Sequence, residues 1–365
     1  MTTLYIDGTS APAEIKAALH HLSQSIDFSK EDLKACNGYV FFGKNKVTEK
    51  SVAVKFYYWG GKPEFHAEPK QLAEITAENV LSIHDAGLIN NNFAYFVTAT
   101  CSKGDLDDVL NSTAIGNRAA LKFTCEILSG LCHLHEKRFL HRDIKPSNIY
   151  VNENSIAVIG DFGSVKRLPD GRSSIPASSH SLLYRPPETV MHNSYGVSGD
   201  IYQTGVVLYQ LLGGHLPYEG RAWLNKHELS KFASMANETD QNAFVDQCVK
   251  AKITNGKILN FSSLPPWVPD NLKRIIKRAC LVDSSKRYPT ASAFMAKLHE
   301  CRHKTLDWRI EEGQPILIGN PSYRIISLGQ LRVQKKHGVE WRNDNSFTGQ
   351  GLKELVTQIS LKALA

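Results

Sequence analysis

The most informative absences concern membranes and secretion. The 365 residues contain no apolar run of about 18 residues, the length that a membrane-spanning helix needs. Residues 1–7 lack the basic stretch followed by apolar residues that begins a secretory signal. We therefore expect neither a membrane span nor a secretory signal.

Regular cysteine spacing is missing too. The seven cysteines are scattered, odd in number, and never form a Cys-x-x-Cys pair, so neither a disulfide framework nor a structural zinc site is expected. Free thiols in a reducing cytoplasm are the simplest interpretation. Residues 132–135 read Cys-His-Leu-His, but they lie in an apolar helical pattern, which favours packing over metal binding.

What remains is the composition of an ordinary globular protein. Hydrophobic residues make up 42% and charged residues 22% of the chain. The length allows one large two-lobed domain with additions, or about two to three ordinary domains. The net charge of +7 permits acidic partners but does not require nucleic acid.

Residues 141–148, with the sequence His-Arg-Asp-Ile-Lys-Pro-Ser-Asn, organise the rest of the chain. They place a carboxylate, a lysine and a carboxamide within eight residues, and Asp161-Phe162-Gly163 begins thirteen residues after Asn148. Phosphoryl transfer from a nucleotide needs these groups. A carboxylate receives the proton of the acceptor hydroxyl, and amide and carboxylate oxygens hold magnesium.

Two short apolar segments, 149–151 and 156–159, surround a polar turn and predict a hairpin that folds Asp161 back beside Asn148. The combined pattern resembles the catalytic loop and metal-binding triplet of eukaryotic-type protein kinases. The resemblance covers roughly residues 31–302. It implies an α+β fold of two lobes, a small β-rich N-lobe and a large helical C-lobe, with ATP and Mg²⁺ as cofactors.

Upstream of this motif, alternating apolar and polar residues predict strands. The segment from Gly38 to Gly43 is followed by a Val-Ala-Val-Lys run that ends at Lys55. In the kinase family a glycine-rich loop covers the nucleotide phosphates, and a Val-Ala-x-Lys strand faces it. The resemblance implies that Val40 and Ala53 sandwich the adenine and that Lys55 reaches the α- and β-phosphates.

The glycine-rich loop departs from the family pattern. In an alignment through Gly38, the first two expected glycines fall at Leu33 and Ala35. Glycines at such positions let backbone N–H groups approach phosphates closely. Their replacement predicts weak ATP affinity, an unusual loop shape or an inactive enzyme.

The family also has a helix carboxylate that pairs with the strand lysine. Glu68 is the favoured candidate, because Leu72 follows one helical turn later and would lie on the same inward face. Glu74 is the second choice, and Pro69 is acceptable in the first turn of a helix. A solvated acidic face is the alternative reading of the four candidates, Glu64, Glu68, Glu74 and Glu78.

Strands are predicted at 83–88 and 93–98, joined by an asparagine turn. By resemblance, Thr98 guards the back of the adenine pocket. The hinge would follow at Ala99, a threonine and Cys101, and would offer backbone N–H and C=O groups to adenine.

In the large lobe, residues 119–137 read as a buried helix that delivers the catalytic loop. The resemblance implies that Asp143 is the base that orients the acceptor hydroxyl, and that Lys145 neutralises the transferred phosphate. Asn148 and Asp161 would bind Mg²⁺. A lysine two residues after the aspartate is typical of Ser/Thr-specific rather than Tyr-specific kinases.

The resemblance assigns architectural roles to three further residues. Glu188 ends a segment resembling Ala-Pro-Glu and is expected to pair with Arg287 through two parallel hydrogen bonds. Asp200 is expected to begin a hydrophobic helix and to hold the backbone of the catalytic loop. Small-molecule kinases of this fold generally lack the Ala-Pro-Glu segment, so a protein substrate is expected.

Residues 164–187 form the expected activation segment. In the family, the arginine at the position of Arg142 binds a phosphate on this segment, so regulatory phosphorylation is expected, with a flexible polar loop as the alternative. Ser181 stands where the family has a hydroxyl bonded to the catalytic aspartate and lysine. The candidate phosphorylation sites are Ser173, Ser174, Ser178 and Ser179.

Some segments lengthen the kinase pattern or lie outside it. Residues 12–22 read as an amphipathic helix, and residues 223–251 read as added helix. Residues 303–365 read as strands followed by a helix, with basic and aromatic residues interspersed among acidic ones. We expect a small α+β domain that binds a protein partner, with nucleic acid as the less favoured alternative.

The predicted organisation is an N-terminal extension at 1–30, an N-lobe at 31–98, a hinge at 99–101, a C-lobe at 102–302 and a C-terminal extension at 303–365. The expected function is ATP- and Mg²⁺-dependent phosphorylation of serine or threonine in a protein substrate, regulated through the activation segment, and the expected location of this protein is the cytoplasm. The alternative is a pseudokinase or scaffold that binds nucleotide weakly and acts through its extensions.

Overall fold

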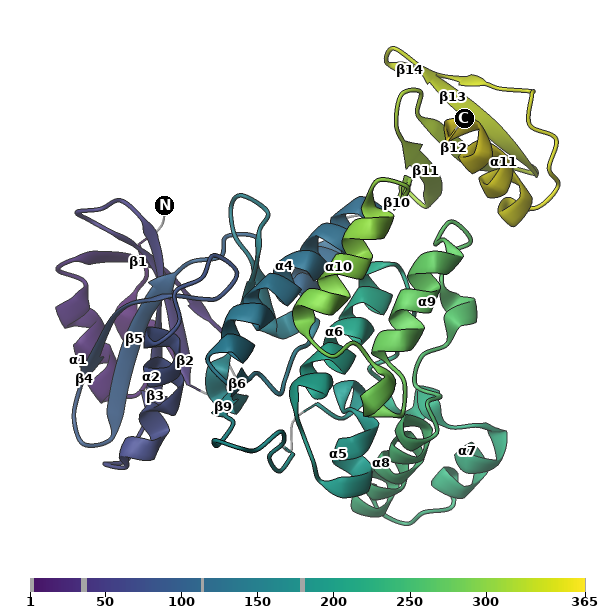
Figure 1. The fold of residues 1–365 in the computed structure, drawn as a ribbon. Coiled ribbons are helices and arrows are strands. Elements are labelled where there is room, and N and C mark those ends of the chain that lie inside the picture. The colour runs from purple at the N-terminus through teal and green to yellow at the C-terminus, as the bar shows by residue number, and fades with distance from the viewer. Residues whose placement is uncertain (1–2, 34–37, 113–114, 178–180, 365) are drawn as a thin grey trace. The chain divides into compact units, whose positions relative to one another are not determined.

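In the computed structural model the described residues are 3–33, 38–112, 115–177 and 181–364. Figure 1 shows how their helices and strands follow one another along the chain. Within these ranges, every helix is either too short or too polar to cross a membrane.

The chain folds into two compact units. The first, here called the sheet unit, combines residues 1–105 with 149–165. The second, the helical unit, combines residues 106–148 with 166–365. The catalytic-loop motif therefore belongs to the helical unit, and Asp161 belongs to the sheet unit.

The sheet unit is built on a five-stranded antiparallel sheet. Its elements are α1 (Ala13–Leu22), β1 (Ile26–Asp32), β2 (Tyr39–Asn45), β3 (Ser51–Tyr58), α2 (Ala67–Ala73), β4 (Ile83–Leu88), β5 (Phe93–Ala99), β7 (Ile149–Val151) and β8 (Ala157–Ile159). The strand order is β1-β2-β3-β5-β4. Strand β3 shows why the sheet forms, because Val52, Val54 and Phe56 alternate with more exposed residues and are buried on one face.

The N-terminal extension is part of this fold. Ile15 and Leu19 on the apolar side of α1 are fully buried in one hydrophobic core with Phe41 and Val54 of the sheet. Strand β1 pairs with β2 along its length, so the domain boundary predicted between residues 30 and 31 falls inside a strand. The extension and the sheet therefore share one core.

The helical unit is arranged around one central helix. Its elements are α3 (Leu106–Ser112), α4 (Asn117–Glu136), β6 (Phe139–Leu140), β9 (Lys166–Arg167), α5 (Pro187–His192), α6 (Val197–Leu211), α7 (Lys226–Ala233), α8 (Glu238–Thr254), α9 (Asp270–Ala279) and α10 (Ala291–Arg302). Helix α6 is buried on nearly all sides and packs against α4 and α9, and α10 packs against α4 (Figure 1). Strand β6, which leads into the catalytic loop, pairs with β9.

The added helix predicted at 223–251 is two helices, α7 and α8. Asn225 begins α7 with a capping box, in which its side chain and that of Glu228 each bind the other's backbone N–H. Asn237 then accepts from the backbone N–H of Asp240 and begins α8. The apolar pattern of residues 223–251 predicted one helix. Two N-caps twelve residues apart divide this segment into two helices.

Residues 303–365 form a small sheet covered by a helix. Its elements are β10 (Asp307–Glu311), β11 (Gln314–Ile318), β12 (Tyr323–Leu328), β13 (Gln330–His337), β14 (Glu340–Asn343) and α11 (Leu352–Leu364). The strands are antiparallel and neighbour each other in chain order. Side chains of α11, including Leu355 and Ile359, share a buried core with Trp308 and Tyr323. The strands and the helix expected in residues 303–365 are present.

This small sheet is attached to the start of α4. The side-chain amide of Asn117 donates to the backbone oxygen of Leu306 at 3.1 Å, and a side-chain oxygen of Asp307 accepts from the backbone N–H of Arg118 at 3.0 Å. The ring of Trp308 stacks on Trp267, with centroids 5.9 Å apart. These contacts join the C-terminal sheet to α4 and to Trp267, within the same helical unit.

Candidate active site

The catalytic-loop motif follows β6 in the helical unit. Lys145 Nζ lies 2.8 Å from Asp143 Oδ2 and donates to Ser181 Oγ at 2.9 Å. Asn148 Nδ2 donates to the backbone oxygen of Asp143 at 2.8 Å and to its Oδ2 at 3.0 Å. The structure thus brings together Asp143, Lys145 and Asn148, with the hydroxyl of Ser181 beside the lysine.

The two carboxylate oxygens of Asp143 have different surroundings. Oδ2 accepts from Lys145 and Asn148, whereas Oδ1 is buried and has no hydrogen-bond partner in the described part of the chain. Leaving a buried acceptor unsatisfied costs about 1–3 kcal/mol. Such an atom is suited to accept a hydrogen bond from a ligand.

Asp200, at the start of α6, fixes the backbone of the catalytic loop. Its two carboxylate oxygens accept from the backbone N–H groups of His141 and Arg142, at 3.0 and 2.9 Å. His135 Nε2 and the hydroxyl of Tyr195 lie 2.8 and 2.7 Å away. Burial alone would raise the pKa of Asp200, but these hydrogen bonds and the nearby histidines lower it below its usual 3.8. The carboxylate is therefore ionised at neutral pH.

Gln203 and Tyr195 complete this support, and neither was singled out from the sequence. Gln203 Oε1 accepts from the backbone N–H of Ile144 at 2.9 Å and from the hydroxyl of Tyr195 at 2.8 Å. Gln203 lies one turn after Asp200 on the same face of α6, where both are buried. The available signal was a glutamine three residues after Asp200, the position that shares a helix face with it.

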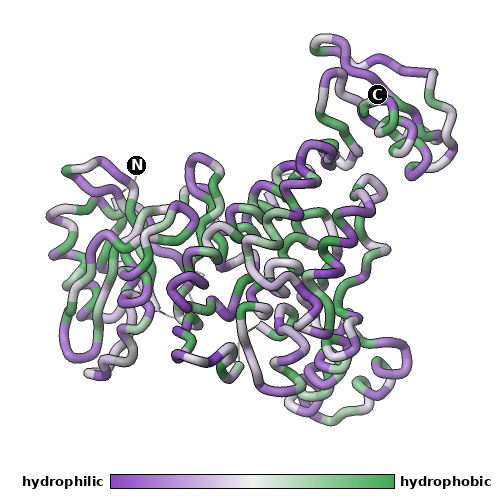
Figure 2. Tube along the Cα trace, viewed as in Figure 1, coloured by the Kyte–Doolittle hydropathy of each residue, from purple (hydrophilic) through white to green (hydrophobic). Residues whose placement is uncertain are grey.

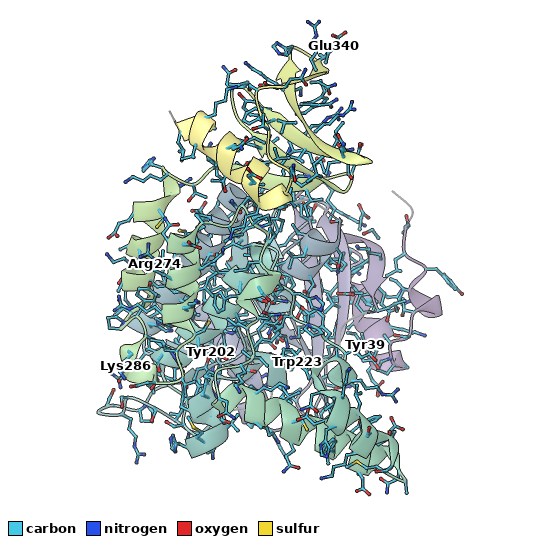
Figure 3. All side chains as sticks on the ribbon, turned by 90° about the vertical axis from the view of Figure 1, so that its right-hand side faces the viewer. Tyr39, Tyr202, Trp223, Arg274, Lys286 and Glu340 are labelled. Carbon is cyan, nitrogen blue, oxygen red and sulfur yellow. The ribbon has the colours of Figure 1, made fainter. Side chains whose placement is uncertain are left out.

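The expected bidentate pair of Arg287 and Glu188 is present. Arg287 Nη1 and Nη2 donate to the two carboxylate oxygens of Glu188, at 2.8 and 2.7 Å. The arginine side chain is fully buried, donates to the backbone oxygens of Ser198 and Leu281, and stacks over Tyr202, which Figure 3 labels. This network anchors the residues that follow the activation segment.

In the sheet unit, Lys55 and Glu68 form the predicted ion pair. Lys55 Nζ lies 2.9 Å from both carboxylate oxygens of Glu68, and the two side chains are only 20% and 16% exposed. Glu68 lies in the first turn of α2, where the following Pro69 is compatible with a helix. Glu74, the second candidate, is exposed at the end of α2.

The residues proposed to contact adenine share one face of the sheet. Val40 pairs with Lys55 across β2 and β3, and Ala53 pairs with Thr98 across β3 and β5. Opposite and alternate residues share a face. These four side chains therefore lie on the face opposite to the core under α1, and Ala99 ends strand β5 beside them.

Cys101 follows in the predicted hinge. Its thiol is unpaired, and burial, assisted by the nearby negative charge of Glu153, raises its pKa to about 11.

The altered glycine-rich loop is only partly described. Leu33 follows β1 and is 83% exposed, and Ala35 lies outside the described residues. Gly38 has a φ of 136°, and a Cβ there would collide with the backbone oxygen of Phe56, so this position requires glycine. Gly38 is thus the only one of the three expected glycines that this sequence keeps. It is also the position where the pairing of β2 with β3 leaves no room for a side chain.

Asp161 follows the predicted hairpin, in which β7 pairs with β8. Its φ of 52° and ψ of 75° lie in the left-handed region, which asparagine and aspartate visit more readily than other side chains. Phe162 is buried, and Gln71 of α2 donates to the backbone oxygen of Val165 at 3.0 Å. Helix α2, which carries Glu68, is thus tied to the turn that carries Asp161.

The described part of the activation segment is held in place. Ile175 and Tyr195 exchange two backbone hydrogen bonds, at 2.9 and 2.8 Å, and Arg142 Nη2 donates to the backbone oxygen of Pro176 at 3.0 Å. Arg142 therefore contacts the segment on which its phosphate ligand was predicted. The four candidate sites divide into the described Ser173 and Ser174, and Ser178 and Ser179, which lie outside the described residues.

The residues fit a nucleotide phosphate and Mg²⁺. Asn148 uses Nδ2 to hold Asp143, which leaves Oδ1 as an oxygen donor for a metal, and Asp161 offers a carboxylate. The described residues contain no cluster of three His, Cys, Asp or Glu side chains for a metal. Mg²⁺ usually takes one or two protein oxygens and completes its shell with water and phosphate.

Comparison with known proteins agrees with this geometry. The profile of the protein kinase domain matches residues 36–299. A probable serine/threonine-protein kinase of Dictyostelium discoideum is 28% identical over 263 residues, which cover 70% of this chain and 14% of the relative. The mitogen-activated protein kinase mpkC of Aspergillus terreus is 28% identical over 285 residues, or 72% of this chain and 74% of the relative.

A third relative is the probable serine/threonine-protein kinase PknB of Lactococcus lactis. It is 26% identical over 250 residues, which cover 68% of this chain and 36% of the relative. The chain thus spans a minor part of the first and third relatives and most of the second. With most of its length matched by that domain, the chain belongs to the protein kinase family.

Proposed function

We propose that this chain transfers the γ-phosphate of ATP to serine or threonine hydroxyls of a protein, with Mg²⁺ as cofactor. The observation that carries the proposal is the state of Asp143. One carboxylate oxygen is fixed by Lys145 and Asn148, and the other is buried without a partner among the described residues. A carboxylate held in this way is suited to orient a hydroxyl and accept its proton.

The residues around Asp143 have complementary roles in this proposal. Lys145 neutralises negative charge on the transferred phosphate, and Ser181 positions the lysine through its hydroxyl. Bound Mg²⁺ would neutralise the phosphate oxygens of ATP, with Asn148 and Asp161 as its protein ligands. A cavity of about 270 Å³ beside Lys145 offers space for a side chain of the acceptor; it is lined by Asp107, Lys145, Ser147, Ser181, Leu182, Leu183, Tyr184 and Tyr218.

The sheet unit is proposed to bind the nucleotide. Lys55, oriented by Glu68, binds the α- and β-phosphates. The adenine contacts apolar side chains on the same sheet face, and its ring nitrogens bind hinge backbone groups. The adenine-binding residues in this proposal are Val40, Ala53, Thr98, Ala99 and Cys101.

Regulation through the activation segment is also part of the proposal. A phosphate on Ser173 or another candidate serine would give Arg142 a doubly charged partner in place of the backbone oxygen of Pro176. Mass spectrometry of fully active protein checks this, because a segment without phosphate would contradict it. We also propose that the protein acts in a reducing compartment such as the cytoplasm, which the unpaired state of six described cysteines supports.

Transfer of labelled phosphate to a mixture of acceptor proteins tests the activity. Asp143→Ala and Asp161→Ala should each lower the rate by roughly 100-fold or more, while Asp246→Asn, at an exposed position of α8, should leave it unchanged. Matching melting temperatures would show that the variants are folded. Equal rates for wild type and both alanine variants would end the enzyme proposal. They would favour the pseudokinase alternative, to which Leu33 and Ala35 point.

A further inference from the structure

The C-terminal sheet has two chemically different faces. Helix α11 covers one face, where Trp308, Tyr323 and Val333 are buried. Because side chains alternate along a strand, the residues between these point to the opposite face. That face carries a group of polar and basic side chains on β12, β13 and β14.

The strand register places five of these side chains together. Arg324 lies opposite Gln334, Arg332 lies opposite Ile326, and Lys336 lies opposite Trp341. Residues two apart on a strand are about 7 Å apart, so the three cations surround Gln334. We call Arg324, Arg332, Gln334, Lys336 and Trp341 the basic face. Figure 2 colours residues 334–337 as hydrophilic.

The positive charge of the basic face is not neutralised by the residues that the structure describes. Among the described residues, Arg324, Arg332 and Lys336 take part in no ion pair, whereas the nearby Arg309 is paired with Glu311. Arg332 and Lys336 are exposed. Like charges this close on a sheet repel one another, so the uncompensated cluster lowers stability and is suited to bind a negatively charged partner.

The basic face is also pre-organised. The guanidinium of Arg324 lies 4.7 Å from the ring centroid of Trp341, and the ammonium of Lys336 lies 5.8 Å from it. Arg324 Nε donates to Gln334 Oε1 at 2.7 Å, and Gln334 Nε2 donates to Asn343 at 3.0 Å. Arg324 is therefore held with its two terminal nitrogens available for a carboxylate, which reduces the entropy lost on binding.

We propose that the basic face docks an acidic segment of a partner protein. Arg332 and Lys336 are four residues apart, about 13 Å along β13, a length that matches two or three carboxylates. Two acidic residues belong to the same sheet: Glu311 ends β10, and Glu340, which Figure 3 labels, begins β14. A face of this size suits a short acidic peptide segment better than a nucleic-acid duplex, because the negative charge of a duplex continues along the whole length of its backbone.

Base stacking is not supported on this face. Its single aromatic residue, Trp341, is already approached by Arg324 and Lys336. Proteins that bind single strands through their bases use several accessible aromatic rings. The acidic groups of a protein segment are therefore the favoured ligand.

The docking face lies away from the catalytic loop along α4. The C-terminal sheet is attached at Asn117 and Arg118, where α4 begins, and the catalytic loop follows the end of this 20-residue helix. An α-helix of this length spans about 30 Å. A partner bound to the basic face can therefore be a substrate or a regulator that leaves Asp143 uncovered.

Binding of a fluorescein-labelled peptide of ten glutamates to the full chain tests the proposal. Fluorescence anisotropy at low salt should show saturable binding. The variant Arg324→Gln/Arg332→Gln/Lys336→Gln should weaken it about tenfold or more. The matched variant Lys304→Gln/Arg342→Gln/Lys353→Gln removes the same charge elsewhere on residues 303–365 and should weaken binding far less. Phosphate transfer to general acceptor proteins should be equal in all three, which separates this test from that of the kinase activity.

Several outcomes would overturn the proposal. Absence of peptide binding to the wild-type chain would contradict docking. An equal loss of affinity in the two triple variants would mean that the peptide is held only by unspecific charge attraction. Tighter binding of a ten-nucleotide oligothymidylate, lost in the basic-face variant, would make the surface a nucleic-acid site instead. Arg332→Gln/Lys336→Gln changes exposed side chains only and keeps the test decisive if Arg324→Gln disturbs the sheet.

Discussion

At the scale of single residues, Asp200 couples the stability of the catalytic loop to pH. Its pKa lies below its usual 3.8 in the folded chain, because hydrogen bonds outweigh the effect of burial. A carboxyl group with a lowered folded pKa stabilises the fold above its unfolded pKa, and this contribution is lost as pH falls through the folded value.

We therefore expect the advantage of wild type over Asp200→Asn in free energy of unfolding to be constant above about pH 5 and to shrink below about pH 4. Urea unfolding between pH 3 and pH 7 measures it. Asp246→Asn, on an exposed side chain, should show no such trend. A difference that is the same at pH 3 and pH 7 would exclude this role for Asp200.

The buried pair of Arg287 and Glu188 gives a second prediction. Arg287→Met leaves the carboxylate of Glu188, which is only 12% exposed, without its bidentate partner. Breaking such a pair costs about 3–5 kcal/mol. Urea unfolding should show this loss, whereas the neighbouring Lys286→Met, at a side chain 73% exposed, should change stability by less than about 1 kcal/mol. Similar losses in both variants would contradict the prediction.

The residues that the sequence identified are those whose spacing is local. Asp143, Lys145 and Asn148 lie within six positions, so a motif suffices to place them. Glu68 had three competitors, and the position of α2 relative to Lys55 separates them. Gln203 binds the backbone of a loop about sixty residues earlier in the chain, a relation that no local pattern contains, and Tyr195 supports it by donating to Gln203.

At the scale of elements, α1 should contribute strongly to the stability of the sheet unit. Leu19 is fully buried between α1 and the sheet. Leu19→Ala should lower the free energy of unfolding by about 2–5 kcal/mol, because it removes apolar contacts and leaves a cavity. Leu361→Ala, at a residue 67% exposed on α11, is the matched control and should have little effect. An equally small effect at Leu19 would show that α1 is dispensable.

Strongly periodic elements were predictable, and weakly marked ones were not. Helices α1 and α11 and strands β3, β5 and β12 carry clear apolar patterns. Strand β1 has two buried apolar residues followed by four polar ones, Ser-Lys-Glu-Asp, so the sequence did not extend the sheet back to Ile26. Strand β10 is five residues long, and it is recognisable as a strand only through its pairing with β11.

At the scale of the whole molecule, the C-terminal sheet should depend on its contacts with residues 106–302 for protection from proteolysis. Trp267→Ala removes the ring that stacks on Trp308. We expect limited proteolysis to cut residues 303–365 several-fold faster in this variant, because local opening becomes easier. Trp223→Ala, a tryptophan whose indole instead donates to the backbone oxygen of Pro217, is the control. Unchanged cleavage in Trp267→Ala would mean that the stacking contributes little.

The kinase family and its two-lobed class followed from motifs. The attachment of residues 303–365 could not be predicted from motifs. No local sequence pattern around Asn117 or Trp267 indicates which distant residues they contact. Contacts such as that between Asn117 and Leu306 join positions 189 residues apart. Only the folded chain shows that this sheet packs against the beginning of the helix that leads to the catalytic loop.

The raised pKa of Cys101 has a consequence for chemical reactivity. With a pKa of about 11, only about one thiol in ten thousand is a thiolate at pH 7. Thiolates are the species that react with electrophiles and peroxides. The cysteine in the proposed adenine hinge should therefore resist alkylation and oxidation. A reversible ligand of this hinge would gain little affinity from an added electrophilic group placed next to the sulfur of Cys101.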